Sequence, residues 1–223
     1  MAGRKAETQY DSKKITDSIK GLKDFYTGML ALALFEAIRG VAEASHEHFF
    51  PQFWFFLFAF CTTLLPFYHG NVRYFDDNYL NKAPNSALLF MLDFLLLSIV
   101  GALLVWTGAI FGEKFNGDYF IKLYACLLVM DIVWGFVARL HEESWSNIKR
   151  WILLNVGTLA AVGLFWGLSR TYQLSNAQRV FIFLFITVVR SILDYWLNWG
   201  FYFPEEKEVV APRTEPGAAG ATS

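Results

Sequence analysis

The sequence contains about six stretches of roughly 20 mostly apolar residues, the length that an α-helix needs to cross the hydrocarbon core of a membrane. They cover residues 22–41, 51–69, 87–111, 119–138, 151–168 and 180–203. A strand interpretation fails, because the runs are too long and do not alternate between apolar and polar residues. The pattern therefore predicts an all-α, polytopic transmembrane helix bundle with about six spans.

The composition agrees with a membrane protein. Residues of the set AVILMFWYC make up 55% of the chain and charged residues only 17%, against about 25% charged residues in ordinary soluble domains. A chain of 223 residues has too little interior to hide so many apolar side chains from water. The predicted partner is thus the lipid bilayer, and the net charge of −1 gives no indication of nucleic-acid binding.

Three regions follow from this pattern. Residues 1–21 are predicted to form a cytoplasmic amphipathic lead-in, residues 22–203 a six-helix transmembrane domain, and residues 204–223 a disordered C-terminal tail. Most Lys and Arg residues outside the apolar stretches lie in the two tails and in the loops on the same side. By the positive-inside rule, both termini are predicted to be cytoplasmic.

The first stretch holds Glu36 and Arg39, two ionisable residues that are unfavourable in a membrane-crossing helix. It could instead lie in the membrane interface, which would reduce the number of spans by one and change the predicted side of the N-terminus. In the second stretch, Pro66 cannot donate a backbone hydrogen bond, which predicts a kink. Gly70 and Asn71 then predict that this helix ends near His69.

Polar and aromatic residues mark the ends of other stretches. Asp118 and Ser175 are candidate N-caps of the fourth and sixth helices. Several aromatic residues lie near predicted ends, where they are expected to anchor the helices in the interface: Trp106, Trp145, Trp151, Trp166, Trp199 and Tyr202.

The most informative feature is charge inside the apolar stretches. An ionised side chain at the membrane centre costs at least ~2.5–3.5 kcal/mol, so it must face a partner, a cavity or water. The residues concerned are Glu36, Arg39, Asp93, Asp131, Arg190 and Asp194. Arg190 and Asp194 are four residues apart on a helix and can pair. With the predicted orientation, the three aspartates lie toward the cytoplasmic half.

The end of the second stretch adds His69 and Arg73, followed by Asp76 and Asp77. Because histidine titrates near neutral pH, this segment could form a proton-sensitive gate or an ion site. A solvated loop with a basic anchor explains the same residues equally well.

The favoured hypothesis is an oligomeric ion channel or an ion- or proton-translocating protein, assembled as a homo-oligomer. Its acidic lining would be Glu36, Asp93, Asp131 and Asp194, with Arg39, Arg73 and Arg190 as counter-charges and His69 at the gate. The fifth stretch contains no charged residue, only Asn155, and is expected to face lipid or another subunit. Arg–Asp pairs that only hold helices together are the structural alternative.

Two other functions remain open. A membrane-embedded enzyme could use a cytoplasmic cluster of His69, Asp76, Asp77, His141, Glu142 and Glu143, although the HExxH pattern of a zinc hydrolase is missing. His46 and His48 are a weak indication of a metal site. The third hypothesis is a scaffold or sensor. No cofactor is predicted, and a cytoplasmic partner protein or ligand is left open.

Overall fold

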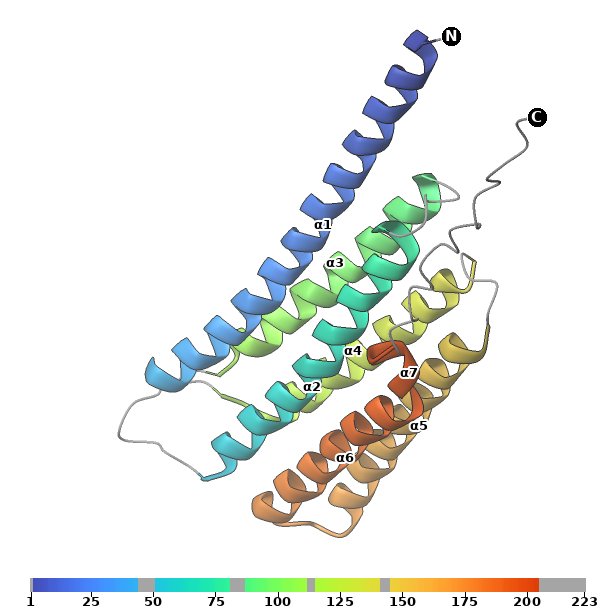
Figure 1. Ribbon diagram of the computed structural model, residues 1–223. Helices are drawn as coiled ribbons and strands as arrows, with labels where there is room; N and C mark the ends of the chain where they lie inside the picture. Colours follow the sequence, from blue (N-terminus) through green and yellow to red (C-terminus); the bar gives the residue numbers. More distant parts are fainter. Residues whose placement is uncertain (1, 44–50, 81–86, 112–114, 141–144, 205–223) are drawn as a thin grey trace, which may run out of the picture.

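The computed structural model describes residues 2–43, 51–80, 87–111, 115–140 and 145–204. Within these ranges the elements follow one another as α1 (Ala2–Glu43), α2 (Pro51–Phe75), the π-helical turn η1 (Asp76–Leu80), α3 (Ala87–Ala109), α4 (Gly117–Ala138), α5 (Trp145–Thr171), α6 (Asn176–Leu197) and α7 (Trp199–Tyr202). The long helices run side by side along one common direction (Figure 1).

Six of the described helices are long and apolar enough to cross a membrane, which confirms the predicted number of spans. The first of them, Thr16–Glu43, includes the stretch for which the sequence also allowed an interfacial position. Large hydrophobic side chains face outward on all of these helices; Leu164, for example, is 68% exposed and Phe35 58%. Side chains of this size are suited to lipid, so the protein is a multi-pass membrane protein.

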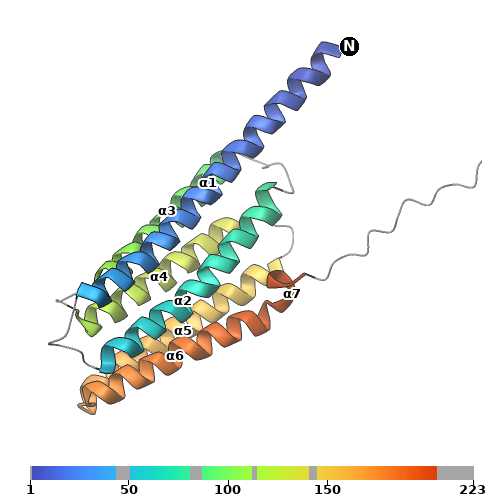
Figure 2. The same cartoon turned by 60° about the vertical axis from the view of Figure 1, so that its left-hand side comes forward.

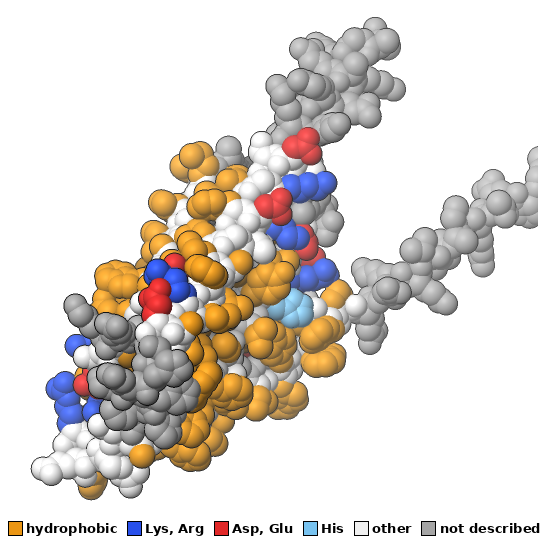
Figure 3. Space-filling view, turned by 90° about the vertical axis from the view of Figure 1, so that its left-hand side faces the viewer, with side chains coloured by type: hydrophobic (Ala, Val, Ile, Leu, Met, Phe, Trp, Pro, Cys, Tyr) orange, Lys and Arg blue, Asp and Glu red, His pale blue; other side chains and the backbone are white. Residues whose placement is uncertain are grey.

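The helices form a closed ring. Going around it, α1 packs on α3, α3 on α4, α4 on α5, α5 on α6 and α6 on α2, and α2 returns to α1. The start of α1 and the short helix α7 lie at the same end of this bundle, called the terminal end below (Figures 1 and 2). On the face shown in Figure 3, charged side chains gather toward the two ends of the bundle and hydrophobic side chains cover the region between them.

The end of the bundle opposite the termini is filled by aromatic rings. Phe56 of α2 lies with its ring centre 5.1 Å from that of Phe120 of α4, and Phe120 lies 5.8 Å from Phe183 of α6. Phe111, which follows α3, contacts Phe120 at 5.5 Å. These four rings are buried, and they form the aromatic layer referred to below.

The second helix does not end near His69 as predicted. It continues to Phe75 and then into η1, because tertiary contacts hold the two residues that were expected to end it. Gly70 and Asn71 are both buried, and the Asn71 amide donates a hydrogen bond to the Tyr26 hydroxyl of α1. Burial against other helices thus outweighs the low intrinsic helix propensity of Gly and Asn.

The helix starts agree with the prediction in one case and differ in the other. Ser175 caps α6 through a capping box with Gln178, as expected. In α4, however, the cap is Asn116, whose side chain accepts a hydrogen bond from the backbone N–H of Tyr119. Asp118 lies inside the first turn and instead pairs with Arg179 at 2.5 Å.

The backbone defect at Pro66 is compensated from a neighbouring helix. Proline leaves the carbonyl of Thr62 without its intrahelical donor, and the Ser191 hydroxyl of α6 donates a hydrogen bond to this carbonyl at 2.8 Å. This contact joins α2 to α6 within the apolar part of the bundle.

Replacing Ser191 with alanine should therefore destabilise the protein by about 1 kcal/mol, the net value of one such hydrogen bond. The same change should cost clearly less in a P66A background, because a backbone N–H at position 66 can then bond the Thr62 carbonyl. Thermal unfolding in detergent, followed by fluorescence size exclusion, measures both effects. An equal loss of stability in the two backgrounds would contradict the compensation.

Candidate functional site

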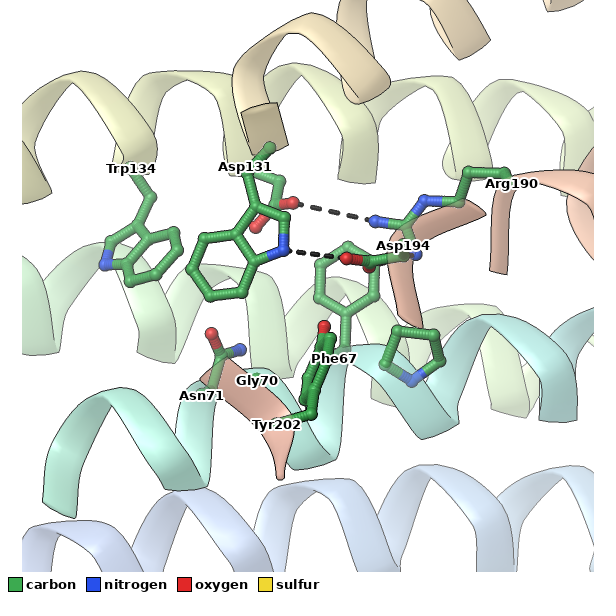
Figure 4. A pocket seen from close by; sticks show the side chains of 10 residues that line it. Phe67, Gly70, Asn71, Asp131, Trp134, Arg190, Asp194 and Tyr202 are labelled. Carbon is green, nitrogen blue, oxygen red and sulfur yellow. Dashed lines mark hydrogen bonds and ion pairs between the residues drawn. The ribbon is translucent and has the colours of Figure 1, made fainter. Parts of the chain in front are cut away.

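A buried guanidinium lies between two carboxylates within the α2–α4–α5–α6 part of the bundle. Arg190 of α6 is 3% exposed; its Nη1 lies 3.4 Å from Asp194 Oδ2, and its Nη2 lies 3.8 Å from Asp131 Oδ2 of α4. Figure 4 shows Asp131 and Arg190 directed toward each other, with Asp194 beside them. The predicted Arg190–Asp194 pair is thus present, and Asp131 completes what is called the charge cluster below.

Neutral side chains from α5, and from Asn198 directly after α6, hold the two carboxylates in place. The Trp151 indole N–H donates to Asp194 Oδ1 at 2.7 Å, and the Asn198 amide donates to the same oxygen at 2.9 Å. Asn155 bridges the other side: its amide N–H donates to Asp131 at 2.5 Å, and its carbonyl accepts from Arg190 Nη2 at 3.0 Å. Trp151 and Asn155 are four residues apart, which places them on the same face of α5.

These supporting residues were missed or misinterpreted at the sequence level. Trp151 and Tyr202 were expected to be interfacial anchors, yet the Trp151 N–H bonds Asp194 and Tyr202 is only 3% exposed. Asn155 gave the one usable indication, because it is the lone strongly polar residue of the apolar stretch 151–168. The face of α5 that carries Asn155 and Trp151 is directed into the bundle, and only its other face is exposed.

The charge cluster borders a small pocket with room for about one water molecule. Its lining comes from α2, α4, α5, α6 and α7, and consists of Pro66, Phe67, Gly70, Asn71, Asp131, Trp134, Trp151, Arg190, Asp194 and Tyr202. Asp131 and Arg190 each lie about two turns, or ~10 Å, before the end of their helices at the terminal end. The pocket therefore belongs to the half of the bundle near the termini, where the sequence placed Asp131 and Asp194.

Tyr202 covers this pocket from α7, beyond the last span. A Cβ atom at Gly70 would lie 3.3 Å from both the Tyr202 hydroxyl and the Trp151 ring, so glycine allows both side chains to approach α2. Figure 4 shows the Tyr202 hydroxyl pointing toward Asp194. Burial and the charge of Asp194 raise the pKa of Tyr202 above its usual range. The phenol thus stays protonated and can act as a hydrogen-bond donor in the pocket.

Asp93 of α3 forms a separate buried site. It is fully buried, and its Oδ2 accepts hydrogen bonds from the Tyr74 hydroxyl of α2, at 2.7 Å, and from the Tyr79 hydroxyl of η1. The Tyr74 and Trp134 rings pack in a T-shaped arrangement, with ring centres 4.8 Å apart. Asp93 is therefore connected to the wall of the pocket through the packing of Tyr74 on Trp134. It does not belong to the charge cluster, which contains Asp131 and Asp194.

Glu36 and Arg39 lie apart from both sites. They pair with each other on α1 at 2.5 Å, and Arg39 also lies 3.6 Å from Glu43. The Arg39 side chain is 51% exposed. These residues are near the end of α1 opposite the termini. The structure thus does not bring them together with the other charged residues.

His69 and Arg73 lie on α2 near the terminal end. The His69 ring packs against Tyr202 of α7, with ring centres 4.8 Å apart, and against Phe203 at 5.3 Å. Arg73 pairs with Asp77 at 3.4 Å, and Asp76 pairs with Lys23 of α1 at 2.6 Å. His69 therefore contacts the element that covers the pocket, while Arg73 does not reach the charge cluster.

Five residues of the two metal-site hypotheses lie outside the described residues, namely His46, His48, His141, Glu142 and Glu143. Within the described ranges, no group of three or more His, Cys, Asp or Glu side chains is arranged to hold a metal ion.

Comparisons with protein-family models, curated proteins and solved structures found no match to this chain.

Proposed function

We propose that this chain is a proton-translocating membrane protein in which Asp131 exchanges the proton. The observation that supports this proposal is the composition of the charge cluster: one guanidinium for two carboxylates, with Arg190 3%, Asp194 2% and Asp131 13% exposed. A buried excess of one negative charge is strongly unfavourable in a bundle surrounded by lipid. Binding one proton neutralises the cluster.

The two carboxylates are not equivalent. Asp194 receives hydrogen bonds from Trp151 and Asn198 and has the shorter contact with Arg190. Asp131 accepts one hydrogen bond from Asn155, and its contact with Arg190 is 3.8 Å long. Hydrogen bonds to a carboxylate favour its ionised form, so the proton is expected on Asp131 and the negative charge on Asp194.

The surroundings of the charge cluster favour a proton over a hydrated ion. The pocket on the terminal side accommodates about one water molecule. On the other side, the aromatic layer of Phe56, Phe111, Phe120 and Phe183 fills the bundle. Three buried hydroxyl side chains lie between the cluster and this layer along their helices, namely Thr63, Tyr124 and Thr187. Hydroxyl groups can relay a proton but cannot replace the full hydration shell of a metal cation.

The predicted orientation and oligomeric state belong to the same proposal. With both termini cytoplasmic, the pocket takes its proton from the cytoplasmic side. α5 exposes Gly157, Gly163 and Gly167, and a Cβ added at any of them would meet nothing within 4 Å. Small residues of this kind allow a helix of a second subunit to approach closely, in agreement with a homo-oligomer.

Proton flux can be tested with the purified protein in liposomes loaded with a pH-sensitive dye. A potassium gradient with valinomycin supplies the driving force. We expect the wild-type protein to acidify or alkalinise the lumen according to the sign of the potential, and the D131N variant to fall to the level of empty liposomes, because asparagine cannot exchange a proton.

The matched control is D24N, which makes the same change at an exposed position of α1 and should leave the flux unchanged. Wild-type flux equal to that of empty liposomes would overturn the proposed function. Undiminished flux in D131N, with normal folding, would overturn the role of Asp131.

A further inference from the structure

Three cationic side chains from three helices surround one indole ring at the end of the bundle opposite the termini. The guanidinium carbon of Arg170 lies 5.0 Å from the centre of the Trp166 ring. The guanidinium carbon of Arg179 and the ammonium nitrogen of Lys122 each lie 5.9 Å from the same centre. The residues come from α4, α5 and α6. None of them takes part in the charge cluster described above.

This group of residues carries an excess of positive charge. Of the three cations, Arg179 pairs with Asp118 at 2.5 Å, whereas Lys122 and Arg170 are exposed. Cation–π contacts with an aromatic ring are weak at exposed sites. These contacts do not neutralise the positive charge of Lys122 and Arg170, which remains after Arg179 has paired with Asp118. A bound anion would neutralise it.

Arg179 supplies a second observation. Its side chain is 24% exposed, yet its Nε–H is buried and has no hydrogen-bond partner among the described residues. The first turns of α4 and α6 begin here, so the positive ends of two helix dipoles point toward the same region. A buried donor, two exposed cations and two helix N-termini together are suited to an oxyanion.

The position of this group at the ends of the apolar spans points to a lipid as the source of this anion. Arg170 is the penultimate residue of α5, and Arg179 lies in the first turn of α6. Trp166 lies one turn deeper, as aromatic residues do at the level of lipid headgroups. On one face of the molecule, Figure 3 shows Lys and Arg side chains gathered at this end of the bundle, beside the hydrophobic surface that faces lipid. Acyl chains of a bound lipid would lie along that surface.

We propose that Lys122, Trp166, Arg170 and Arg179 form a binding site for the phosphate of an anionic phospholipid. The headgroup phosphate takes hydrogen bonds from the two arginines and the ammonium group, and the acyl chains lie against the exposed apolar faces of α5 and α6. The site is independent of proton translocation.

The test uses the purified full-length protein and measures retained lipid by native mass spectrometry after titration with phosphatidylglycerol or phosphatidylcholine. We expect phosphatidylglycerol to bind preferentially to the wild-type protein. The K122Q/R170Q variant should bind it about thirtyfold more weakly, from roughly 1 kcal/mol for each cation near the membrane surface. Neither side chain is in an ion pair within the described part of the chain, so folding should persist, and an unchanged melting temperature verifies this.

The matched control is K20Q/K149Q, which removes two exposed cations from the terminal end and should retain full binding. Equal binding of the two lipids, or unchanged phosphatidylglycerol binding in K122Q/R170Q, would overturn the proposal. In a third arm, inorganic phosphate is compared with chloride at equal ionic strength. Displacement of phosphatidylglycerol by phosphate alone would assign the site to a free anion and overturn its assignment to lipid.

Discussion

Replacing Arg190 with leucine should destabilise the bundle by about 3–5 kcal/mol, the cost of removing one partner from a buried ion pair. Both Asp131 and Asp194 would lose their cation while remaining buried. The side-chain carbonyl of Asn155 would also lose the hydrogen bond that Arg190 donates to it. The packing of the guanidinium over the Phe67 ring, at 5.2 Å, would also disappear. We expect a large loss of folded protein in fluorescence size exclusion and a clearly lower melting temperature.

The control for this prediction removes the charges together. In the R190L/D131N/D194N variant no uncompensated charge remains, so much of the stability lost in R190L should return, since coupled residues do not have additive effects. The triple variant should nevertheless show no proton flux. If R190L were as stable as the wild-type protein, the three side chains would not form a coupled buried cluster.

The second large effect concerns the contact between α1 and α3. A Cβ atom at Gly40 would lie 1.3 Å from the carbonyl oxygen of Phe111, and one at Gly108 would lie 2.1 Å from that of Ala33. Neither backbone can move away without separating the two helices. G40A and G108A should each cost about 1–3 kcal/mol or more, as overpacking does in well-packed cores.

The matched control is G28A on the same helix α1, where an added Cβ meets nothing within 4 Å. This change should be neutral or stabilise α1 by up to ~1 kcal/mol, because alanine is the better helix former. Melting temperatures of the three variants in the same detergent measure the difference. Equal stabilities of G40A and G28A would show that α1 does not pack closely on the end of α3.

Interactions within one helix could be predicted from the sequence. Arg190 and Asp194, four residues apart, do pair, and the Ser175 cap forms as expected. The depth of Asp131 and Asp194 also followed from their positions along the apolar stretches. These features depend on helical periodicity and on the rise per residue, both of which are constant along a chain that stays helical.

Interactions between helices could not be predicted in the same way. Nothing in the spacing indicates that Asp93 meets Tyr74 and Tyr79, or that Ser191 bonds the Thr62 carbonyl. The order of the helices around the ring decides these contacts. The end of α2 is a similar case, since Gly70 and Asn71 stay helical only because other helices bury them.

The sequence by itself thus determined that the chain forms about six membrane spans and that ionisable groups lie inside them. Lipid requires long apolar helices, and an ionisable residue within such an apolar run is easily recognised in the sequence. The tertiary structure decided which of these charges act together. It placed Arg190 between two aspartates and left Glu36 and Arg39 as a pair of their own on α1. The physical reason is that burial can be inferred from residues along one helix, whereas compensation of a buried charge depends on which helices become neighbours.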